Sequence, residues 1–450
     1  MQIAFRGPMS ASRLPQLIFA FLRSLRPESQ KKQKWSQMQL NGQSLRSELF
    51  NENQLERHAK TVAAQHQVDA NRGRDLLIPR LAENENVLVH AYDIITAAVR
   101  EGQRVAPAGE WLLDNFYLIE EHIRMAQLHL PRTYSRQLPR LLKGSRSGYP
   151  RVYDIVLELI SHVDGRVSEE NLSGFIHAYQ TVQPLTLGEL WGVPIMLRLA
   201  LIENLREVAM SLTVRRSQRN LAHIWADRML KSVETKPGKV VEVLAALIQS
   251  NPPFTSPFTE ELCRKLQGQS HDVDFVLTWM EHQLAEQGLT REHLQRLDSQ
   301  VQAADQISIG NSIASLRFLS SMDWREFVES FSILEQTLRK DPTGVYVHMD
   351  FRTRDRYRHR VEMLARRSKF NEQEVAGAAI HLASEAGNRE GPRTRAAHVG
   401  YYLIDQGLPL LERAIHMEWS VGRGIAWIKP LRFSSLTRPS TCEINSRTMS

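Results

Sequence analysis

Apolar residues recur every three to four positions along most of the chain, which is the spacing of amphipathic α-helices. The clearest case is 151–163, where the apolar positions are Val152, Ile155, Val156, Leu159, Ile160 and Val163. The same spacing predicts helices over 111–130, 195–209, 239–249, 259–266, 273–286 and 360–385. Prolines fall between these segments, and alternating strand patterns are nearly absent. The pattern predicts an all-α fold of many irregular helices, without a repeat of fixed period.

The pattern also divides the chain into three regions. Residues 45–413 are predicted to be helical, with a weak boundary at 232–258, where prolines and a glycine interrupt the helices. Residues 416–450 lose the periodicity and are predicted to be disordered. Residues 1–40 form a basic leader, either unstructured or, over 13–26, an amphipathic helix on an anionic membrane surface. Its apolar run is short for a secretory signal, and no clear cleavage site follows it.

The charge distribution and the composition argue against several classes of protein. The chain has 450 residues and a formal net charge of +7, of which 1–34 carry +6 and 416–450 carry +3. The helical body is therefore close to neutral, which argues against a nucleic-acid-binding face. Two cysteines cannot build a disulfide framework or a cysteine-rich zinc site, and they fit a reducing compartment. No apolar run reaches the roughly 18–20 residues that a membrane-spanning helix needs.

The sequence contains no strong catalytic signature, only weak candidates. A D-x-D pair, Asp272 and Asp274, opens a predicted helix, where acidic residues offset the helix dipole, rather than ending a strand. His122 lies on an apolar stripe and is predicted to be a core residue rather than a metal ligand. Carboxylates that a helical glycosidase could use are Asp114, Glu120, Glu121 and Glu189, but helices of this composition offer many by chance. We predict no catalytic residue, no cofactor and no metal for this chain.

The segment 349–360 carries the highest density of charge. Arg352, Arg356 and Arg360 share one face of a helix there, so their guanidinium groups could bind a phosphate or an acidic partner surface. The candidate docking residues are Arg352, Arg354, Arg356 and Arg360. The alternative is a salt-bridged helix start, in which the arginines pair with the carboxylates of Asp350, Asp355 and Glu362.

Several motifs, in order along the chain, resemble the N-terminal region of bacterial cyclic β-1,2-glucan synthases. They are Glu110–Phe116, Gly148–Tyr153, Leu185–Trp191, Ser308–Arg317, Asp323–Phe327, Leu334–Gln336, Asp341–Tyr346, the M-D-F-x-T-R-D-R-Y-R-H run at 349–359, and His398–Asp405. The resemblance covers about 45–413, and so many motifs in one order are more specific than any single one.

The resemblance implies a part of a UDP-glucose-dependent, membrane-embedded synthase at the cytoplasmic face of the inner membrane. In the complete proteins this region precedes a membrane glycosyltransferase segment and a phosphorylase-like region. The Q-x-x-R-W motif of the transferase is missing here, so we expect a truncated or frameshifted product that is inactive alone. Its expected partner is the membrane-embedded transferase part. A helical scaffold that binds a protein partner, without enzymatic activity, is the alternative.

Overall fold

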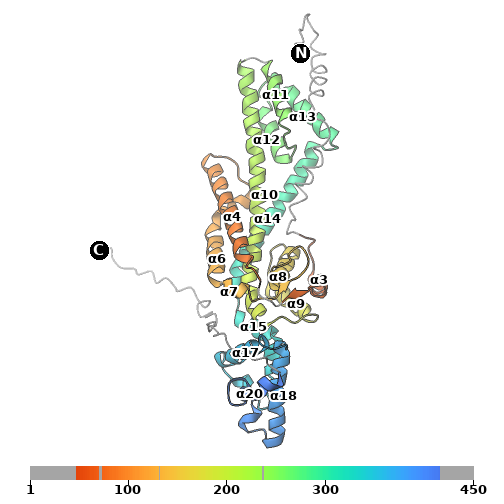
Figure 1. Ribbon diagram of the computed structural model, residues 1–450. Coiled ribbons are helices and arrows are strands. Elements are labelled where there is room, and N and C mark those ends of the chain that lie inside the picture. Colours follow the sequence, from red (N-terminus) through yellow and green to blue (C-terminus); the bar gives the residue numbers. More distant parts are fainter. Residues whose placement is uncertain (1–46, 70–72, 131, 236–237, 416–450) are drawn as a thin grey trace, which may run out of the picture. The chain divides into compact units, whose positions relative to one another are not determined.

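The computed structural model describes residues 47–69, 73–130, 132–235 and 238–415, and it confirms the all-α prediction (Figure 1). Within these residues the one sheet consists of β1 (Val68–Asp69) and β2 (Arg140–Leu141), which are antiparallel, with Val68 opposite Leu141. The predictions for 1–40 and 416–450 lie outside the described residues. The boundary proposed at 232–258 stays a prediction.

The chain forms two compact units, and each is built from separate segments of the sequence. Over the described residues, the first unit takes 47–55, 66–172 and 195–316, and the second takes 56–65, 173–194 and 317–415. Two long helices, α10 (Leu187–Thr235) and α14 (Arg291–Ser321), contribute residues to both units.

The first unit is centred on two helices that are buried on nearly every side. Residues 151–162 and 195–205 expose very little of their surface, and polar side chains such as Arg151, Asp154, Arg198 and Glu203 are buried with the apolar ones. Besides its shares of α10 and α14, the helices of this unit are α4 (Leu77–Arg100), α5 (Pro107–Asp114), α6 (Phe116–His129), α7 (Arg132–Ser135), α8 (Arg151–His162), α11 (Lys239–Gln249), α12 (Ser256–Leu266), η1 (His271–Val273) and α13 (Asp274–Glu286).

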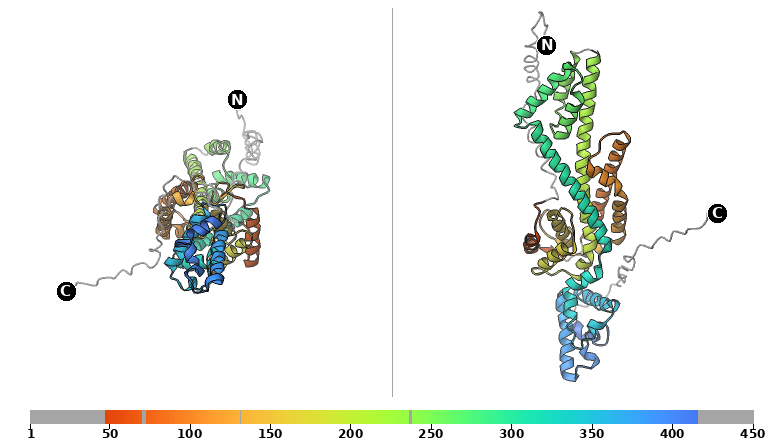
Figure 2. Two further views of the ribbon diagram at one scale, coloured as in Figure 1. Left: turned by 60° about the horizontal axis from the view of Figure 1, so that its bottom comes forward. Right: turned by 180° about the vertical axis from the view of Figure 1, so that it is seen from behind.

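Within this unit α10 and α14 come together over part of their length and diverge toward α13 (Figure 1, Figure 2). Polar side chains meet where the two helices are in contact. The buried amide of Asn204 donates hydrogen bonds to the hydroxyls of Ser308 and Ser312, each at 2.9 Å. Further along, Arg215 and Asp298 form an ion pair at 2.8 Å. Because a buried polar group must find its partner, these contacts fix the register of the two helices.

A separate apolar core joins the end of α10 to α11, α12 and α13. It is made of Ala222, Trp225, Ala226, Met229, Val240, Leu244, Leu247, Phe258, Leu262, Cys263, Leu266, Val273, Val276, Trp279 and Met280. The helical spacing over 239–249, 259–266 and 273–286 places these side chains on inward faces, so the predicted helices agree with α11, α12 and α13.

Two predicted helices are interrupted. The helix expected over 111–130 breaks at Asn115, whose backbone (φ −111°, ψ 11°) lies between α5 and α6 and whose amide donates to the carbonyl of Trp111 at 3.0 Å. The helix expected over 360–385 breaks before Asn371, which forms a capping box with Glu374. Both breaks occur at asparagine, whose side chain satisfies backbone groups that a helix end leaves unpaired.

The second unit packs short helices around α18 (Glu372–Glu390), which contacts α16, α17, α19 and α20. Besides its shares of α10 and α14, the other elements of this unit are most of α3 (Glu52–Gln65) and α9 (Glu169–Gln180), then α15 (Trp324–Phe331), α16 (Ile333–Leu338), η2 (Tyr346–His348), α17 (Phe351–Ala365), η3 (Arg395–Ala397), α19 (Val399–Ile404) and α20 (Leu408–Ala414).

Side-chain caps set where four of these helices begin. Asp323, Ser332, Asp350 and Asn371 accept hydrogen bonds from backbone N–H groups in the first turns of α15, α16, α17 and α18. Each such cap typically stabilises a helix by about 1 kcal/mol. The caps thereby fix the registers of α15, α16 and α17, the three helices that carry the charged residues described next.

Candidate functional site

The five arginines at even positions of α17 point to two sides of the helix. Residues two apart are separated by about 200° around a helix axis, so alternate arginines face opposite ways. One set is Arg354 and Arg358, here called the inner pair. The other is Arg352, Arg356 and Arg360, here called the outer arginines.

The inner pair binds two glutamates from α15 and α16. The two nitrogens Arg354 Nη2 and Arg358 Nη1 each lie 2.8 Å from a carboxylate oxygen of Glu329. Arg358 Nη1 also lies 2.9 Å from Glu335 Oε2, and both of these side chains are 0% exposed. The hydroxyl of Tyr346 donates to the same oxygen of Glu335 at 2.7 Å. Three helices and η2 are thus joined by one buried ion network.

This network keeps Arg358 charged and Tyr346 protonated. Burial by itself would lower the pKa of Arg358, but Glu329 and Glu335 hold it above its ordinary value. Burial and the Glu335 carboxylate both raise the pKa of Tyr346, which therefore stays a neutral donor. Because each charge is buried with its partner, loss of one partner would leave an uncompensated charge in the interior.

The outer arginines are in a different environment. Arg352 and Arg356 are exposed and Arg360 is half-buried, and none of the three forms an ion pair with a residue that the structure describes. Burial lowers the pKa of Arg360, with Glu412 opposing this shift and Arg367 adding to it.

The carboxylates predicted as alternative partners are engaged elsewhere. Asp350 accepts hydrogen bonds from the N–H and hydroxyl of Thr353, at 3.0 and 2.7 Å. Asp355 pairs with Arg358 at 3.4 Å. Glu362 pairs with Arg366 at 2.7 Å and with His359 at 3.1 Å. The structure therefore separates Arg354 from the other three candidate docking residues, and the anion-binding role of the outer arginines stays a prediction.

Sequence reasoning missed four residues of the ion network: Arg358, Glu329, Glu335 and Tyr346. Arg358 follows Arg354 by four residues, which is the signal that could have paired them on one face. The acidic partners lie 23 and 29 residues earlier in the chain, and sequence spacing alone does not bring them to α17.

A groove opens beside the network, between α15 and α16. It has a volume of about 440 Å³ and is lined by Arg325, Glu326, Glu329, Ser330, Gln336 and Arg339. Most of these side chains are exposed, so the groove is open to solvent. We call it the α15–α16 groove.

His122 is a core residue, as the sequence predicts. It is fully buried on α6, and its Nδ1 lies 3.1 Å from Nε of Arg198 on α10. Burial, together with Arg198, lowers the pKa of His122 to about 4, so it is neutral near pH 7. Burial also lowers the pKa of Arg198, to about 10. His122 Nε2 has no hydrogen-bond partner among the described residues.

The carboxylates considered for glycosidase chemistry do not form one site. Asp114, Glu120 and Glu121 are exposed on α5 and α6. Glu189 is fully buried in the second unit, where it accepts hydrogen bonds from the N–H and hydroxyl of Thr186 at the start of α10. Asp272 and Asp274 open η1 and α13, as the sequence predicts for helix-start residues.

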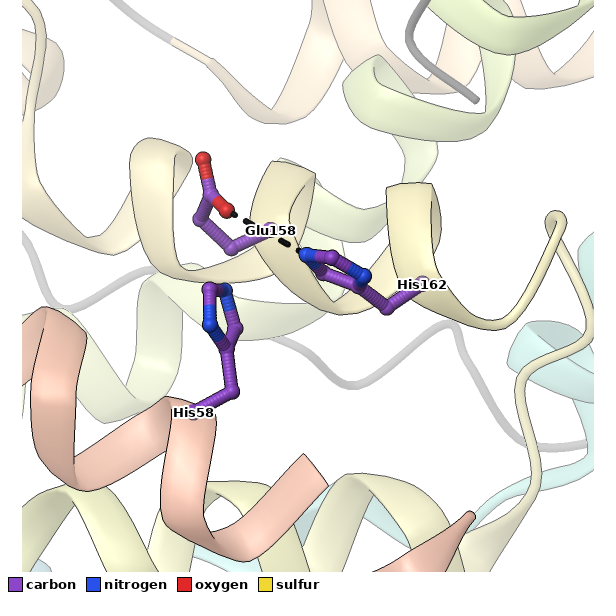
Figure 3. A group of neighbouring side chains, drawn as sticks. All are labelled: His58, Glu158 and His162. Atoms are coloured by element: carbon purple, nitrogen blue, oxygen red, sulfur yellow. Dashed lines mark ion pairs between the residues drawn. The ribbon is translucent and has the colours of Figure 1, made fainter. Parts of the chain in front are cut away.

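Glu158 and His162 lie one turn apart on α8 and form an ion pair at 3.9 Å (Figure 3). The same glutamate also pairs with Arg146 at 2.7 Å, and the ring of Phe50 stacks on His162. His58, also drawn in Figure 3, lies on α3 in the second unit, and we assign no metal site to the three residues.

None of the helices within the described residues has the length and apolarity to cross a membrane. No family model matches the chain. The chain is 30% identical over 339 residues to the cyclic beta-(1,2)-glucan synthase NdvB of Rhizobium meliloti (strain 1021). This match covers 75% of the present chain and 12% of that protein, so the chain spans about an eighth of its relative. The resemblance to the cyclic β-1,2-glucan synthases that the motifs predict is thereby confirmed.

Proposed function

We propose that this chain acts as a helical module of a cyclic β-1,2-glucan synthase, without transferase activity of its own. The observation that supports this most is the 30% identity over 75% of the chain to a protein named as such a synthase. The module would work at the cytoplasmic face of the inner membrane, next to the membrane-embedded transferase part.

The outer arginines are the surface that we propose for docking onto that transferase part. Two arginines of α17 are neutralised inside the unit, whereas Arg352, Arg356 and Arg360 have no ion-pair partner among the described residues. Three guanidinium groups along one helix face fit an acidic protein surface, to which they could donate charge-assisted hydrogen bonds.

The test replaces Arg352, Arg356 and Arg360 by Gln together, in this chain and at the matching positions of a full-length synthase. We expect the melting temperature to change little, since Arg352 and Arg356 are exposed, the half-buried Arg360 has no ion pair to lose among the described residues, and such charges typically contribute a few tenths of a kcal/mol each. Co-purification of the tagged chain with the transferase part should fall by about tenfold or more.

A matched control removes the same charge elsewhere, with Gln at the exposed positions Arg291, Arg296 and Arg393. Co-purification should survive in this control. Retention of the transferase part by the α17 triple variant would contradict the docking role, and so would a large loss of melting temperature. If the unaltered chain captures no transferase part but does capture another protein, the scaffold function is favoured instead.

A further inference from the structure

The charged walls of the α15–α16 groove are held in place from behind. Glu329 is bound by both arginines of the inner pair. Arg339 pairs with the buried Glu335 at 3.1 Å. The guanidinium of Arg325 lies over the ring of Phe351, 5.3 Å from its centre. Groups that are fixed before a ligand arrives lose less entropy on binding, which favours recognition.

The groove has no excess of either charge. Its lining contains two arginines and two glutamates. The network behind it adds Arg354 and Arg358, and these are matched by Glu335 and Asp355. A phosphate or a nucleotide would therefore meet as much repulsion as attraction, whereas a neutral polar ligand would not.

The lining offers donors and acceptors side by side. Arginine only donates hydrogen bonds, and ionised glutamate only accepts them. Gln336 uses its Nε2 on the carbonyl of Ser330 at 3.2 Å, which leaves its Oε1 as an acceptor. Ser330 directs its hydroxyl proton toward backbone carbonyls and keeps acceptor capacity. Hydroxyl groups, each of which both donates and accepts, match such a lining.

We propose that the α15–α16 groove binds a short, uncharged β-1,2-linked gluco-oligosaccharide. The neutral, polyhydroxylated class of the ligand follows from the groove itself, and the sugar and its linkage rest on the proposed function. The volume of about 440 Å³ is within the range of roughly 300–1,000 Å³ that is typical of ligand pockets. The groove would hold a stretch of glucan near the module without any catalytic step.

The experiment is calorimetric titration of the purified full chain with linear β-1,2-linked gluco-oligosaccharides. We expect binding that is weakened about tenfold or more by Arg325→Gln and by Glu326→Gln, because each removes a charged hydrogen-bonding partner. Both residues are exposed, so the variants should keep the melting temperature of the unaltered chain. Arg393→Gln and Glu292→Gln make the same chemical changes at exposed positions outside the groove, and they should bind normally.

Three results would overturn the proposal: no heat of binding with any oligosaccharide, full binding by the Arg325→Gln, Glu326→Gln double variant, or preferential binding of inorganic phosphate. Equal affinity for β-1,4-linked oligosaccharides would overturn the linkage. None of these measurements involves the transferase part, so docking through the outer arginines can fail or succeed independently of them.

Discussion

Arg358 illustrates how one residue position decides between a structural and a surface role. It is 0% exposed and binds Glu329 and Glu335, whereas Arg356, two residues earlier, is exposed. Taking a guanidinium and a carboxylate out of water costs several kcal/mol per ion, which only close pairing offsets. The inner pair therefore stabilises the second unit only while every member of the network is present.

Replacement of Glu335 by Gln tests this dependence. The variant keeps the shape of the side chain but leaves Arg358 with one carboxylate fewer and turns an amide donor toward other donors. We expect the unfolding free energy of the second unit to fall by about 3–5 kcal/mol. The measurement is thermal unfolding followed by circular dichroism and calorimetry.

The comparison for this variant is Glu326→Gln, an exposed neighbour on α15, which should melt like the unaltered chain. Equal melting of Glu335→Gln and Glu326→Gln would show that the buried network contributes nothing to stability.

At the scale of single residues, the sequence predicted the outer face of α17, because residues four apart share a face. It could not predict the inner pair, whose glutamates come from α15 and α16 and meet α17 only through tertiary packing.

Helix ends, at the scale of elements, tie distant segments of the second unit together. A carboxylate oxygen of Glu372, the first residue of α18, accepts a hydrogen bond at 2.8 Å from the backbone N–H of Leu187, the first residue of α10. A negative group is favoured at a helix N-terminus, but burial disfavours its charge. Here burial, aided by Glu362 and Glu189, outweighs the hydrogen bond and raises the pKa of Glu372 to about 7.

A pH dependence follows from this raised pKa. The folded chain retains a proton on Glu372 that the unfolded chain, with a pKa near 4.5, releases, so stability falls as pH rises from about 4.5 to 7. Glu372→Gln still accepts the hydrogen bond and cannot ionise. It should therefore gain about 1–3 kcal/mol over the unaltered chain at pH 8 compared with pH 4, after allowance for partial exposure.

Urea unfolding of both proteins across this pH range measures the effect. Glu385→Gln, on the exposed side of the same helix, is the matched control for the loss of one carboxylate. Parallel curves for Glu372→Gln and the unaltered chain would show that Glu372 does not titrate between pH 4 and 8. An inverted difference, with the variant less stable at high pH, would mean that Glu372 is charged and stabilising there.

Most helices could be predicted from the three-to-four spacing, and α11 matches its predicted range 239–249. The break at Asn115 could not, because the apolar spacing continues through that position. The break before Asn371 follows the polar run 366–369, and Asn371 with Glu374 three residues later is a capping-box signal that the apolar pattern alone does not use. A polar residue on an apolar stripe gives no sign of whether its side chain caps a new helix or faces solvent. Tertiary packing decides between these outcomes, and the hydrophobic pattern does not contain it.

For the whole molecule, the proposed function predicts that the purified chain transfers no glucose. Asp272 and Asp274 lie at a helix start, where Ser270 and His271 contact them, rather than at the end of a strand that could hold a metal against a diphosphate. Radiolabelled UDP-glucose incubated with the chain and Mg²⁺ or Mn²⁺ should give no labelled glucan. A full-length synthase under the same conditions is the positive control, and label incorporated by the chain alone would contradict the prediction.

The second unit is built from three separate stretches of sequence, so its folding during synthesis has to wait for the last of them. Residues 173–194 pack against partners made much later: Gln180 bonds the carbonyl of Phe331 at 3.0 Å, and Trp191 meets the ring of Phe351. At roughly 5–20 residues per second, synthesis leaves this early stretch without its partners for on the order of ten seconds. During that interval its apolar side chains are available to chaperones, so insertions between 195 and 316 that lengthen the wait should lower the yield of folded protein rather than its final stability.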